Sequence, residues 1–241
     1  HMSALSQLNI IQVNGLSKIV TTFEGELPIL SDISFNVKHG ESVAIVGTSG
    51  SGKSTLLSLL AGLDTATNGE IFLDGEPLHD LDEEARAALR AAKIGFVFQS
   101  FMLVQSLTAL ENVMLPAELA GKSDAKEQAL TLLEKVGLSH RTDHYPSQLS
   151  GGEQQRVAIA RAFIGTPKIL FADEPTGNLD TKTGATIIDL LFELNREFGT
   201  TLVLVTHDLR LAERCDRSIL IDSGVITAEP IQAKASALIE S

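Results

Sequence analysis

The sequence is poor in several features that each mark a class of protein. It has one cysteine, Cys215, in 241 residues, which excludes an intrachain disulfide and is compatible with a reducing compartment. No run of 18 apolar residues occurs, so we expect no segment that spans a membrane by itself. The chain does not open on a basic segment followed by an apolar core, so we also expect no secretory signal. Internal repeats and low-complexity linkers are absent as well.

Positive charge is also scarce. Lysine and arginine number 19 against 31 aspartates and glutamates, which gives a formal net charge of −12. A protein that binds a phosphate backbone normally carries a basic stripe, and this sequence has no dense cluster of lysine and arginine. We therefore expect no nucleic-acid partner and interpret the charge as an aid to solubility.

Length and hydrophobic content indicate a folded protein. Hydrophobic residues make up 44% of the chain, which favours a filled core over disorder. The length fits one large α/β domain or a core with a substantial insertion. The first two residues, His1-Met2, are interpreted as a remnant of cloning. Residues 229–241 are expected to be a C-terminal tail, either a short helix or a frayed end.

The order of strands and helices predicts an α/β fold. Helix formers fill residues 83–92, and residues 107–165 read as further helices, with Gly137 as a C-cap. A helical period returns over residues 183–198. Apolar or β-rich runs that predict strands occupy residues 8–16, 33–40, 42–47, 69–76, 94–99, 168–173 and 201–207. The sequence thus predicts a parallel sheet core that is interrupted by a helical insertion.

The most informative motif is a phosphate-binding loop. Residues 47–55 read GTSGSGKST between the apolar runs 42–46 and 56–60, the strand–loop–helix context of G-x-x-x-x-G-K-[ST]. Its glycines let backbone N–H groups turn toward an anion, and the following helix adds its positive dipole end. Lys53 is predicted to reach the β- and γ-phosphates, and the Ser54 hydroxyl to ligate Mg²⁺. The alternative is a glycine-rich turn that only joins a strand to a helix. The predicted nucleotide-binding residues are Gly47, Ser49, Gly50, Ser51, Gly52, Lys53, Ser54 and Thr55.

A second apolar strand, residues 169–172, ends in two carboxylates, Asp173 and Glu174. Neighbouring side chains on a strand point to opposite faces, so these two acids are expected to have different roles. Asp173 is predicted to hold Mg²⁺, as the acidic partner of a phosphate loop does. Glu174 is predicted to orient and deprotonate the attacking water. The alternative is a pair of solvated acids at a strand end.

Residues 149–156 form a second glycine-rich motif, LSGGEQQR. Ser150 and Glu153 have the spacing of a capping box at a helix start. A cap does not need Gly151 and Gly152, each of which costs about 1 kcal/mol in a helix relative to alanine. We interpret the bare backbone as a place where a phosphate approaches the helix start. Since the chain's own loop already holds one nucleotide, the motif predicts a dimer that sandwiches ATP.

Three weaker signals have two interpretations each. Gln99 follows the strand 94–98, where a polar side chain can sense Mg²⁺ or the attacking water. His207 ends the strand 201–206 and can reach a γ-phosphate if the strands are parallel, or simply belong to a helix start with Asp208 as N-cap. Asn178 to Asp180 form either a turn with a helix start or a surface at which Asp180 faces a dimer partner.

Together these residues resemble an ABC-type ATPase, the nucleotide-binding subunit of a membrane transporter, from about Leu8 to Gly224. Five motifs appear in the family's order, and the sequence around them resembles the lipoprotein-release and macrolide-export branch. The resemblance implies a P-loop NTPase fold with a RecA-like parallel sheet core and an N-terminal antiparallel β subdomain. It implies one domain over residues 4–228, in which a helical subdomain of about 99–165 is inserted between core segments 4–98 and 166–228.

The resemblance also implies roles for the site residues. One subunit would bind ATP through Lys53, Ser54, Thr55 and Gln99, and the other through Ser150, Gly151 and Gly152. Glu174 would act as the base and His207 would contact the γ-phosphate. Mg²⁺ would be held by Ser54, Gln99 and Asp173, and Asp180 would lie at the partner's nucleotide.

The family further implies a separate integral-membrane permease, which alone contacts the membrane, and a place on the cytoplasmic face of the inner membrane. Hydrolysis would drive export or extraction of a lipophilic substrate or lipoprotein. The permease would dock where the helical insertion meets the Gln99 loop. Phe101, Met102, Leu103 and Leu107 either form that docking surface or belong to the core of the helical subdomain.

The sequence departs from the family at one position. An aromatic residue that stacks on adenine is common where this chain has Val20, and Phe23 is the nearest substitute. The preference for ATP over GTP is therefore open. Two other functions compete with this one. The first is a soluble ABC ATPase acting on DNA or ribosomes, which the excess of acidic over basic residues disfavours. The second is a P-loop small-molecule kinase. A kinase leaves Ser150, Gly151, Gly152 and His207 without a role.

Overall fold

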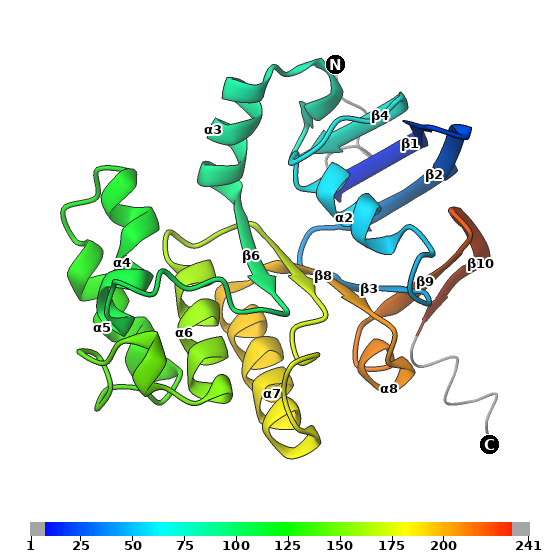
Figure 1. The fold of residues 1–241 in the computed structure, drawn as a ribbon. Coiled ribbons are helices and arrows are strands. Elements are labelled where there is room, and N and C mark those ends of the chain that lie inside the picture. The colour runs from blue at the N-terminus through cyan, green and yellow to red at the C-terminus, as the bar shows by residue number, and fades with distance from the viewer. Residues whose placement is uncertain (1–7, 233–241) are drawn as a thin grey trace. The chain divides into compact units, whose positions relative to one another are not determined.

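A computed structural model describes residues 8–232, which fall into two compact units (Figure 1). The first unit contains residues 1–90 and 201–241, and the second contains residues 91–200. The predicted remnant His1-Met2 lies outside the described residues. Helix α3 (Glu83–Lys93) begins in the first unit and ends in the second. The predicted limits of the domain and of its helical subdomain stay predictions.

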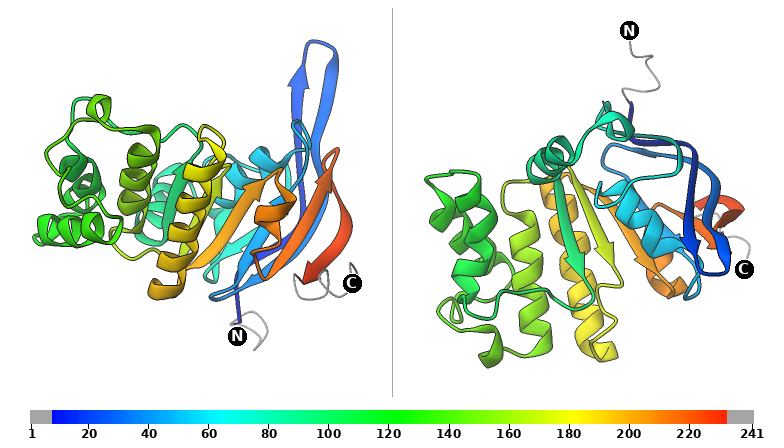
Figure 2. Two further views of the ribbon diagram at one scale, coloured as in Figure 1. Left: turned by 90° about the horizontal axis from the view of Figure 1, so that it is seen from below. Right: turned by 45° about the horizontal axis from the view of Figure 1, so that its top comes forward.

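The first unit is built mainly from strands. Its elements are β1 (Asn9–Thr22), β2 (Gly25–Lys38), β3 (Ser42–Val46), α2 (Lys53–Leu60), β4 (Asn68–Leu73), β5 (Glu76–Pro77), a 3-10 turn (Leu78–Asp80), β8 (Thr201–Thr206), α8 (Leu209–Ala212), β9 (Arg217–Asp222) and β10 (Val225–Gln232). One sheet is antiparallel, with strand order β2-β1-β4-β5. Its strands β1 and β2 form one long hairpin, which is blue in Figure 2.

The other strands of the first unit follow the order β10-β9-β3-β8. Strand β3 is parallel to both β8 and β9, and β10 is antiparallel to β9. The runs Val43–Val46 and Leu202–Val205 are buried throughout, as expected for parallel strands covered on both faces. Helix α2 buries Leu56, Leu57, Leu59 and Leu60. The predicted α/β fold with an antiparallel β subdomain is confirmed.

The C-terminal prediction needs a correction. Residues 229–232, expected in the tail, belong to strand β10, because this segment pairs back onto β9 through Ile231–Ser218 and Gln232–Arg217. The pairing partner β9 was not predicted as a strand. The rest of the predicted tail, residues 233–241, lies outside the described residues.

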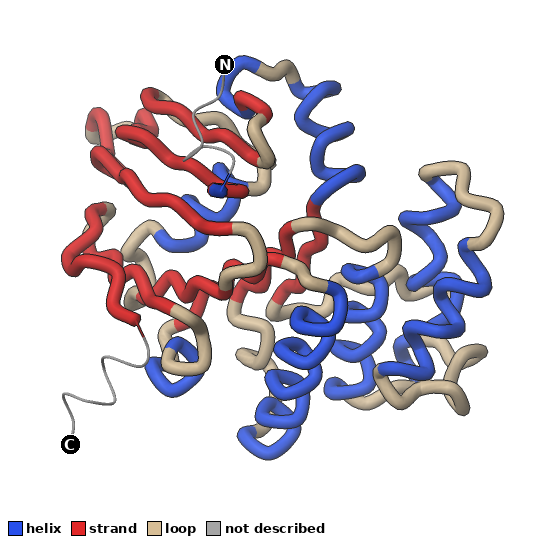
Figure 3. The backbone as a smooth tube through the Cα atoms, turned by 180° about the vertical axis from the view of Figure 1, so that it is seen from behind, coloured by secondary structure: helices blue, strands red, loops and turns tan. Residues whose placement is uncertain are grey.

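The second unit is mainly helical. Its elements are β6 (Ile94–Phe98), α4 (Ala109–Leu119), α5 (Ala125–Lys135), a 3-10 turn (Pro146–Gln148), α6 (Gly151–Phe163), β7 (Ile169–Asp173) and α7 (Thr181–Phe198); Figure 3 colours them by type. Strands β6 and β7 are parallel, with Phe98 opposite Asp173. The main buried residues of this unit are Val157–Ala160, Ile169–Ala172, Ile187, Ile188, Leu191 and Leu194.

Local signals explain where these helices begin and end. Helix α4 starts at a capping box of Thr108 and Glu111. Helix α5 has Val136 as its C-cap, one residue before the predicted Gly137, which follows in the left-handed conformation with φ of 78°. The expectation of helices throughout 107–165 is too broad, because residues 136–150 contain only a 3-10 turn. Within residues 8–232, no helix combines the length and apolar character needed to cross a bilayer.

Candidate nucleotide-binding site

In the first unit the phosphate loop connects β3 to α2, as predicted. Two glycines carry its left-handed backbone, Gly50 with φ of 80° and Gly52 with φ of 102°. Gly52 is the N-cap of α2, and no side chain caps this helix. A helix start without a side-chain cap is suited to binding an anion.

Packing explains two further requirements for glycine. A Cβ atom at Gly47 would lie 2.7 Å from the Ile221 carbonyl oxygen, and one at Gly52 would lie 2.8 Å from Leu30 Cδ2. The loop thus packs directly against strands β9 and β2. Any side chain at Gly47 would displace the loop, because a backbone oxygen cannot move aside as a flexible side chain does.

The polar side chains of the loop fit a triphosphate and its metal. Lys53 is only 8% exposed, and its ammonium donates to the Gly47 carbonyl over 2.7 Å at the first residue of the loop. The buried Ser51 hydroxyl has no hydrogen-bond partner among residues 8–232. Ser54 is exposed at the start of α2, so its hydroxyl is open to a metal, and oxygen is the ligand that Mg²⁺ prefers.

His207 follows β8 in the same unit. In the parallel register Val46 of β3 lies opposite Thr206 of β8, so Gly47 and His207 follow paired residues at one edge of the sheet. The condition placed on His207, that the strands be parallel, is met. The alternative interpretation, a helix start with Asp208 as N-cap, is also supported, since the Asp208 carboxylate caps α8 by accepting from the Arg210 N–H at 2.9 Å.

Val20 lies on the β1–β2 hairpin, where it pairs with Leu27. The hairpin reaches the phosphate loop, because Gly52 approaches Ile29 and Leu30. Phe23, the suggested substitute for an aromatic residue, is fully exposed at the hairpin turn. No neighbouring side chain therefore holds its ring in one position.

In the second unit, Gln99 and Glu174 follow the paired residues Phe98 and Asp173. The structure thus brings Gln99, Asp173 and Glu174 together at the carboxyl ends of β6 and β7. No cluster of three or more histidine, cysteine, aspartate or glutamate side chains suited to a metal exists among residues 8–232. Binding of Mg²⁺ by Gln99 and Asp173 stays a prediction, and it would rest on mixed oxygen donors and not on a carboxylate cluster.

Glu174 differs from the expectation in its backbone. The argument from alternating strand faces fails, because β7 ends at Asp173 and Glu174 has a left-handed φ of 46°. Its carbonyl accepts the Gly177 N–H at 3.0 Å, which closes a turn. Asp173 and Glu174 still have different surroundings, because the chain turns between them. Left-handed backbone at a residue other than glycine is strained and concentrates at functional sites.

Two residues that support Gln99 were not predicted. The Asn178 side chain exchanges hydrogen bonds with Gln99, accepting from its amide at 3.1 Å and donating to its carbonyl at 3.2 Å. Gln155, fully buried on α6, donates to the carbonyls of Phe98 and Pro175. It therefore ties together the residues just before Gln99 and just after Glu174. Gln155 stands between Gln154 and Arg156 in a polar stretch of α6, so no sequence signal distinguishes it from its neighbours.

The second glycine-rich motif starts α6, as predicted. The Ser150 hydroxyl accepts the Glu153 N–H at 3.2 Å, and the Glu153 carboxylate accepts the Ser150 N–H at 2.9 Å. The capping box is therefore confirmed. The Ser150 backbone N–H is the main reason that the pKa of Glu153 is lowered, with smaller contributions from Arg141 and Arg156.

The two glycines have neighbours inside the chain. A Cβ atom at Gly152 would lie 2.6 Å from Thr183 Cγ2, and one at Gly151 would lie 3.2 Å from Leu179 Cδ2. The premise that bare backbone here implies a phosphate is therefore too strong, because close packing of α6 on α7 already requires Gly152. Binding of a phosphate at Ser150, Gly151 and Gly152 stays a prediction.

Asp180 caps α7 beside this motif. Its carboxylate accepts the Thr183 N–H at 3.2 Å. A hydrogen bond with the Thr183 side chain, followed by this backbone one, lowers the pKa of Asp180. Thr183 is the residue that contacts Gly152, so Asp180 and the motif lie at neighbouring helix starts. The interpretation as a turn and helix start is confirmed, and a contact with a dimer partner stays a prediction.

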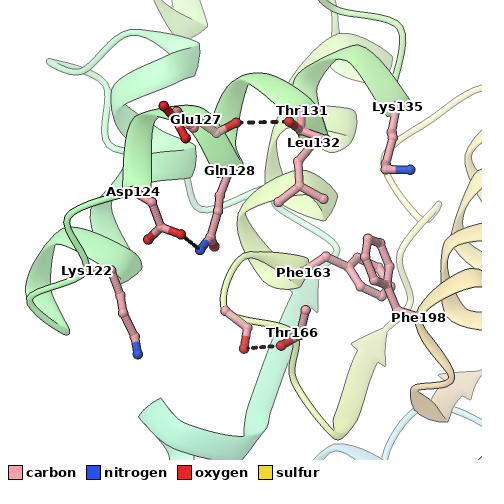
Figure 4. Close-up of a pocket in the computed structure, with 11 residues that line it drawn as sticks. Lys122, Asp124, Glu127, Gln128, Thr131, Leu132, Lys135, Phe163, Thr166 and Phe198 are labelled. Carbon is pink, nitrogen blue, oxygen red and sulfur yellow. Dashed lines mark hydrogen bonds between the residues drawn. The ribbon is translucent and has the colours of Figure 1, made fainter.

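The four apolar residues after Gln99 divide between surface and core. Met102 is 58% exposed, whereas Leu103 is 8% exposed and belongs to the core. Phe101 and Leu107 are half-buried. A cavity of about 490 Å³ lies elsewhere in this unit, between α5 and the ends of α6 and α7, around Leu132, Phe163 and Phe198 (Figure 4). None of the predicted site residues lines it.

Known proteins resemble the chain over most of its length. The profile of a family described as ABC transporter matches residues 30–177. The chain is 61% identical over 223 residues to YbbA of Escherichia coli K12, described as an uncharacterized ABC transporter ATP-binding protein, covering 92% of this chain and 98% of that protein. YbbA of Shigella flexneri matches to the same extent.

Solved structures agree with this likeness. The ATP-binding cassette MJ0796, in a dimeric post-hydrolysis state bound to ADP and Pi, has a TM-score of 0.85 and 41% identity, covering 92% of this chain and 98% of that one. The protein cbiO1 of Clostridium perfringens, part of the ABC transporter complex cbiONQ, has a TM-score of 0.85 and 29% identity, covering 96% of this chain and 92% of that one.

Proposed function

The chain belongs to the ATP-binding proteins of ABC transporters and is an ATPase of that family, and we propose that two copies close around two ATP molecules to drive a separate membrane subunit. The observation that carries the proposal is the uncapped, glycine-built start of α2, with Lys53 buried beside it and His207 at the same sheet edge. A small-molecule kinase is not a member of this family, so that alternative falls.

Binding depends on the phosphate loop. Backbone N–H groups of residues 47–52 hold the phosphates, and Lys53 exchanges the Gly47 carbonyl for the β- and γ-phosphates. Val20 on the adjoining hairpin contacts the base. Ser54, Gln99 and Asp173 supply oxygen ligands for Mg²⁺, which when bound neutralises charge on the phosphates.

Hydrolysis depends on Glu174, Gln99 and His207. Glu174 accepts a proton from the attacking water, Gln99 orients that water, and His207 contacts the γ-phosphate. Support comes from the turn that follows Asp173 and from the mutual hydrogen bonds of Gln99 and Asn178, which fix the glutamine beside the strand ends. A fixed position matters because a small displacement of a water-orienting group slows catalysis strongly.

Closure of the dimer depends on the start of α6. We assign Ser150, Gly151, Gly152 and Asp180 to the partner's nucleotide. The relative MJ0796 is a dimeric cassette, and one of its structures holds ADP and Pi. Neighbouring starts of α6 and α7 in this chain support the assignment, because they bring these four residues to one place.

The ATPase dimer acts on a separate integral-membrane permease at the cytoplasmic face of the inner membrane. Met102 is the best candidate for contact with the permease, since its apolar side chain is exposed next to the Gln99 loop. The cargo is a lipophilic substrate or a lipoprotein, and the direction is export or extraction. This assignment rests on the likeness of residues 96–116, 149–162, 172–180 and 205–212 to that branch of the family.

The first test is the oligomeric state of the Glu174→Gln protein, measured by light scattering with and without Mg-ATP. We expect a monomer that becomes a dimer only with Mg-ATP, because the substitution removes the base and preserves the phosphate loop. ATP turnover should fall to background. Unchanged turnover would contradict the role of Glu174.

A second test, on glycine variants, separates dimer closure from folding. Gly151→Ala adds a methyl group 3.2 Å from the end of the Leu179 side chain, and Gly184→Ala adds one at the same 3.2 Å from Thr176. In the Glu174→Gln background, Gly151→Ala should prevent the ATP-dependent dimer, whereas the matched control Gly184→Ala should preserve it. Dimers in both variants would contradict the assignment of Gly151 to the partner's nucleotide.

A further inference from the structure

The loop that follows Gln99 contains two consecutive left-handed residues with side chains. Phe101 has φ of 43° and Met102 has φ of 59°. The Met102 N–H donates to the Ser100 carbonyl, so the backbone folds tightly at this point. A phenylalanine and a methionine in succession have no intrinsic preference for this conformation. Other parts of the second unit must therefore impose it.

Arg161 of α6 holds this strained pair. Its guanidinium donates to the Met102 carbonyl at 2.8 Å and to the Phe101 carbonyl at 3.1 Å. None of the ion pairs among residues 8–232 includes Arg161, and burial lowers its pKa. Arg161 is half-buried, and a cation whose hydrogen bonds go to two adjacent carbonyls stabilises a single backbone conformation, because the planar guanidinium fixes both acceptors at once.

We call the two hydrogen bonds from Arg161 to the Phe101 and Met102 carbonyls the clamp. The clamp connects the Gln99 loop to the start of α6. The Phe101 ring lies 3.6 Å from where a Cβ atom of Gly151 would be, while its carbonyl is bound by Arg161 near the other end of the helix. Two residues before Phe101, Gln99 is bound by Asn178. After Met102, Asn112 of α4 binds the N–H and carbonyl of Val104. The loop is thus fixed on both sides, and Arg161 fixes its centre.

We propose that Arg161 is a positioning residue for hydrolysis, which holds the left-handed Phe101–Met102 backbone so that Gln99 stays in register and Met102 stays at the surface. The inference rests on the proposed function, because it assigns Arg161 to the support of Gln99. Arg161 itself touches no reacting atom. Its effect is on the rate of the chemical step and on the contact of Gln99 with Mg²⁺, and not on the phosphate loop, because Lys53 belongs to the other unit of the chain.

The test combines hydrogen exchange with steady-state kinetics on the full chain. In Arg161→Met, amide exchange in the peptide covering residues 99–107 should rise about tenfold, because two charge-assisted hydrogen bonds are lost. The kcat for ATP should fall about tenfold, while the Kd for ATP measured without Mg²⁺ should stay unchanged, because that binding depends on the phosphate loop. Adding Met102→Asn should restore part of both values, because asparagine tolerates the left-handed conformation. Whether the loss reflects only lower stability is decided by a control variant in the other unit.

Arg86→Met is the matched control. Arg86 is also largely buried and donates to a backbone carbonyl, that of Leu81 at 3.1 Å, but it lies in the first unit. This control should lower the melting temperature and preserve both kcat and exchange in residues 99–107. Arg161→Lys, which keeps the charge without the planar fork, should give intermediate exchange. If Arg161→Met does not fold, the lysine variant decides by the same two measurements.

Wild-type exchange and wild-type kcat in Arg161→Met would overturn the positioning role. So would a fall in kcat that matches the Arg86→Met control without faster exchange in residues 99–107. Exchange requires no nucleotide, so it tests the clamp even if the wild-type protein hydrolyses no ATP. That last result would overturn the proposed function and the catalytic consequence of the clamp, while leaving the Arg161 hydrogen bonds to be judged by exchange.

Discussion

The chain contains two glycine-rich helix starts that look alike in sequence and differ in structure. Helix α2 begins with left-handed Gly52, has no side-chain cap and has no acidic residue in its first turn. Helix α6 begins with Ser150 in an extended conformation, has a complete capping box and carries Glu153 in its first turn. No side chain caps the N–H groups at the start of α2, whereas the capping box satisfies part of the N–H groups at the start of α6.

This difference separates two uses of glycine. In the phosphate loop, glycine supplies backbone conformations and clearances that no other residue allows. At α6, Gly152 allows close packing on Thr183, and the ionised Glu153 places a negative charge at the helix start. The start of α6 is therefore a weaker anion site by itself than the start of α2. A nucleotide held there needs a second surface, which is the physical reason that our proposal requires a partner subunit.

The largest expected effect comes from Gly47→Ala in the phosphate loop. The new methyl group would lie 2.7 Å from the Ile221 carbonyl oxygen, so the loop must shift away from its position. We expect the affinity for ATP to fall about 100-fold or more, because two or more charge-assisted hydrogen bonds to phosphate are lost. Isothermal titration calorimetry on the isolated chain measures the change in Kd.

Gly121→Ala is the control for this variant. Gly121 has a left-handed φ of 73° and open space around it. Alanine there should destabilise the fold by about 1 kcal/mol and preserve ATP binding. Equal affinities for ATP in Gly47→Ala and the wild type would show that the packing of the loop against β9 does not matter for binding.

The next effect compares the two glycines of α6. Gly152→Ala would place a methyl group 2.6 Å from Thr183, and we expect overpacking of about 2 kcal/mol, partly offset by about 1 kcal/mol of helix propensity. Gly151→Ala meets only the flexible end of Leu179, so the propensity gain should make it equal to or more stable than wild type. Urea unfolding of both variants measures the difference. A Gly152→Ala protein that is more stable than Gly151→Ala would refute this account of the packing.

The phosphate loop could be predicted from sequence because its requirements are local. Gly50, Gly52 and Lys53 stand at fixed spacings between a buried strand and a helix, so nine residues contain the whole argument. The capping box at Ser150 and the cap at Asp180 are local for the same reason. The order of strands and helices up to β8 followed from apolar runs of ordinary length, whereas β9 and β10 were not predicted.

The supports of the site could not be predicted in this way. Gln155 and Arg161 act on carbonyls about 20 to 60 positions away in sequence, so their role depends on the finished packing. The left-handed backbone of Phe101, Met102 and Glu174 carries no sequence signal either, because none of them is glycine or asparagine. These positions are stabilised by distant side chains instead of by their own preferences.

A smaller effect tests that statement on the loop after Gln99. Met102→Asn replaces an exposed left-handed methionine with a residue that adopts this conformation readily, so we expect a gain of about 0.5–1 kcal/mol in the free energy of unfolding. Val104→Asn is the control, since Val104 is 39% exposed and has no left-handed backbone; it should give no gain. Equal effects in the two variants would mean that Met102 is not strained.

The smallest effect is the pH dependence that Glu153 brings to α6 and that α2 lacks. The pKa of Glu153 is lowered in the folded state, chiefly by the Ser150 N–H. Its stabilisation is therefore complete above the ordinary pKa of glutamate and is lost as pH falls through the lowered value. Glu153→Gln should remove this part, giving a melting temperature lower by about 1–2 °C at pH 7 and a difference that shrinks as the pH falls through the lowered pKa. The exposed Glu193→Gln is the control, and a Glu153 difference that stays constant across an acid titration would show that the glutamate acts through packing and not through its charge.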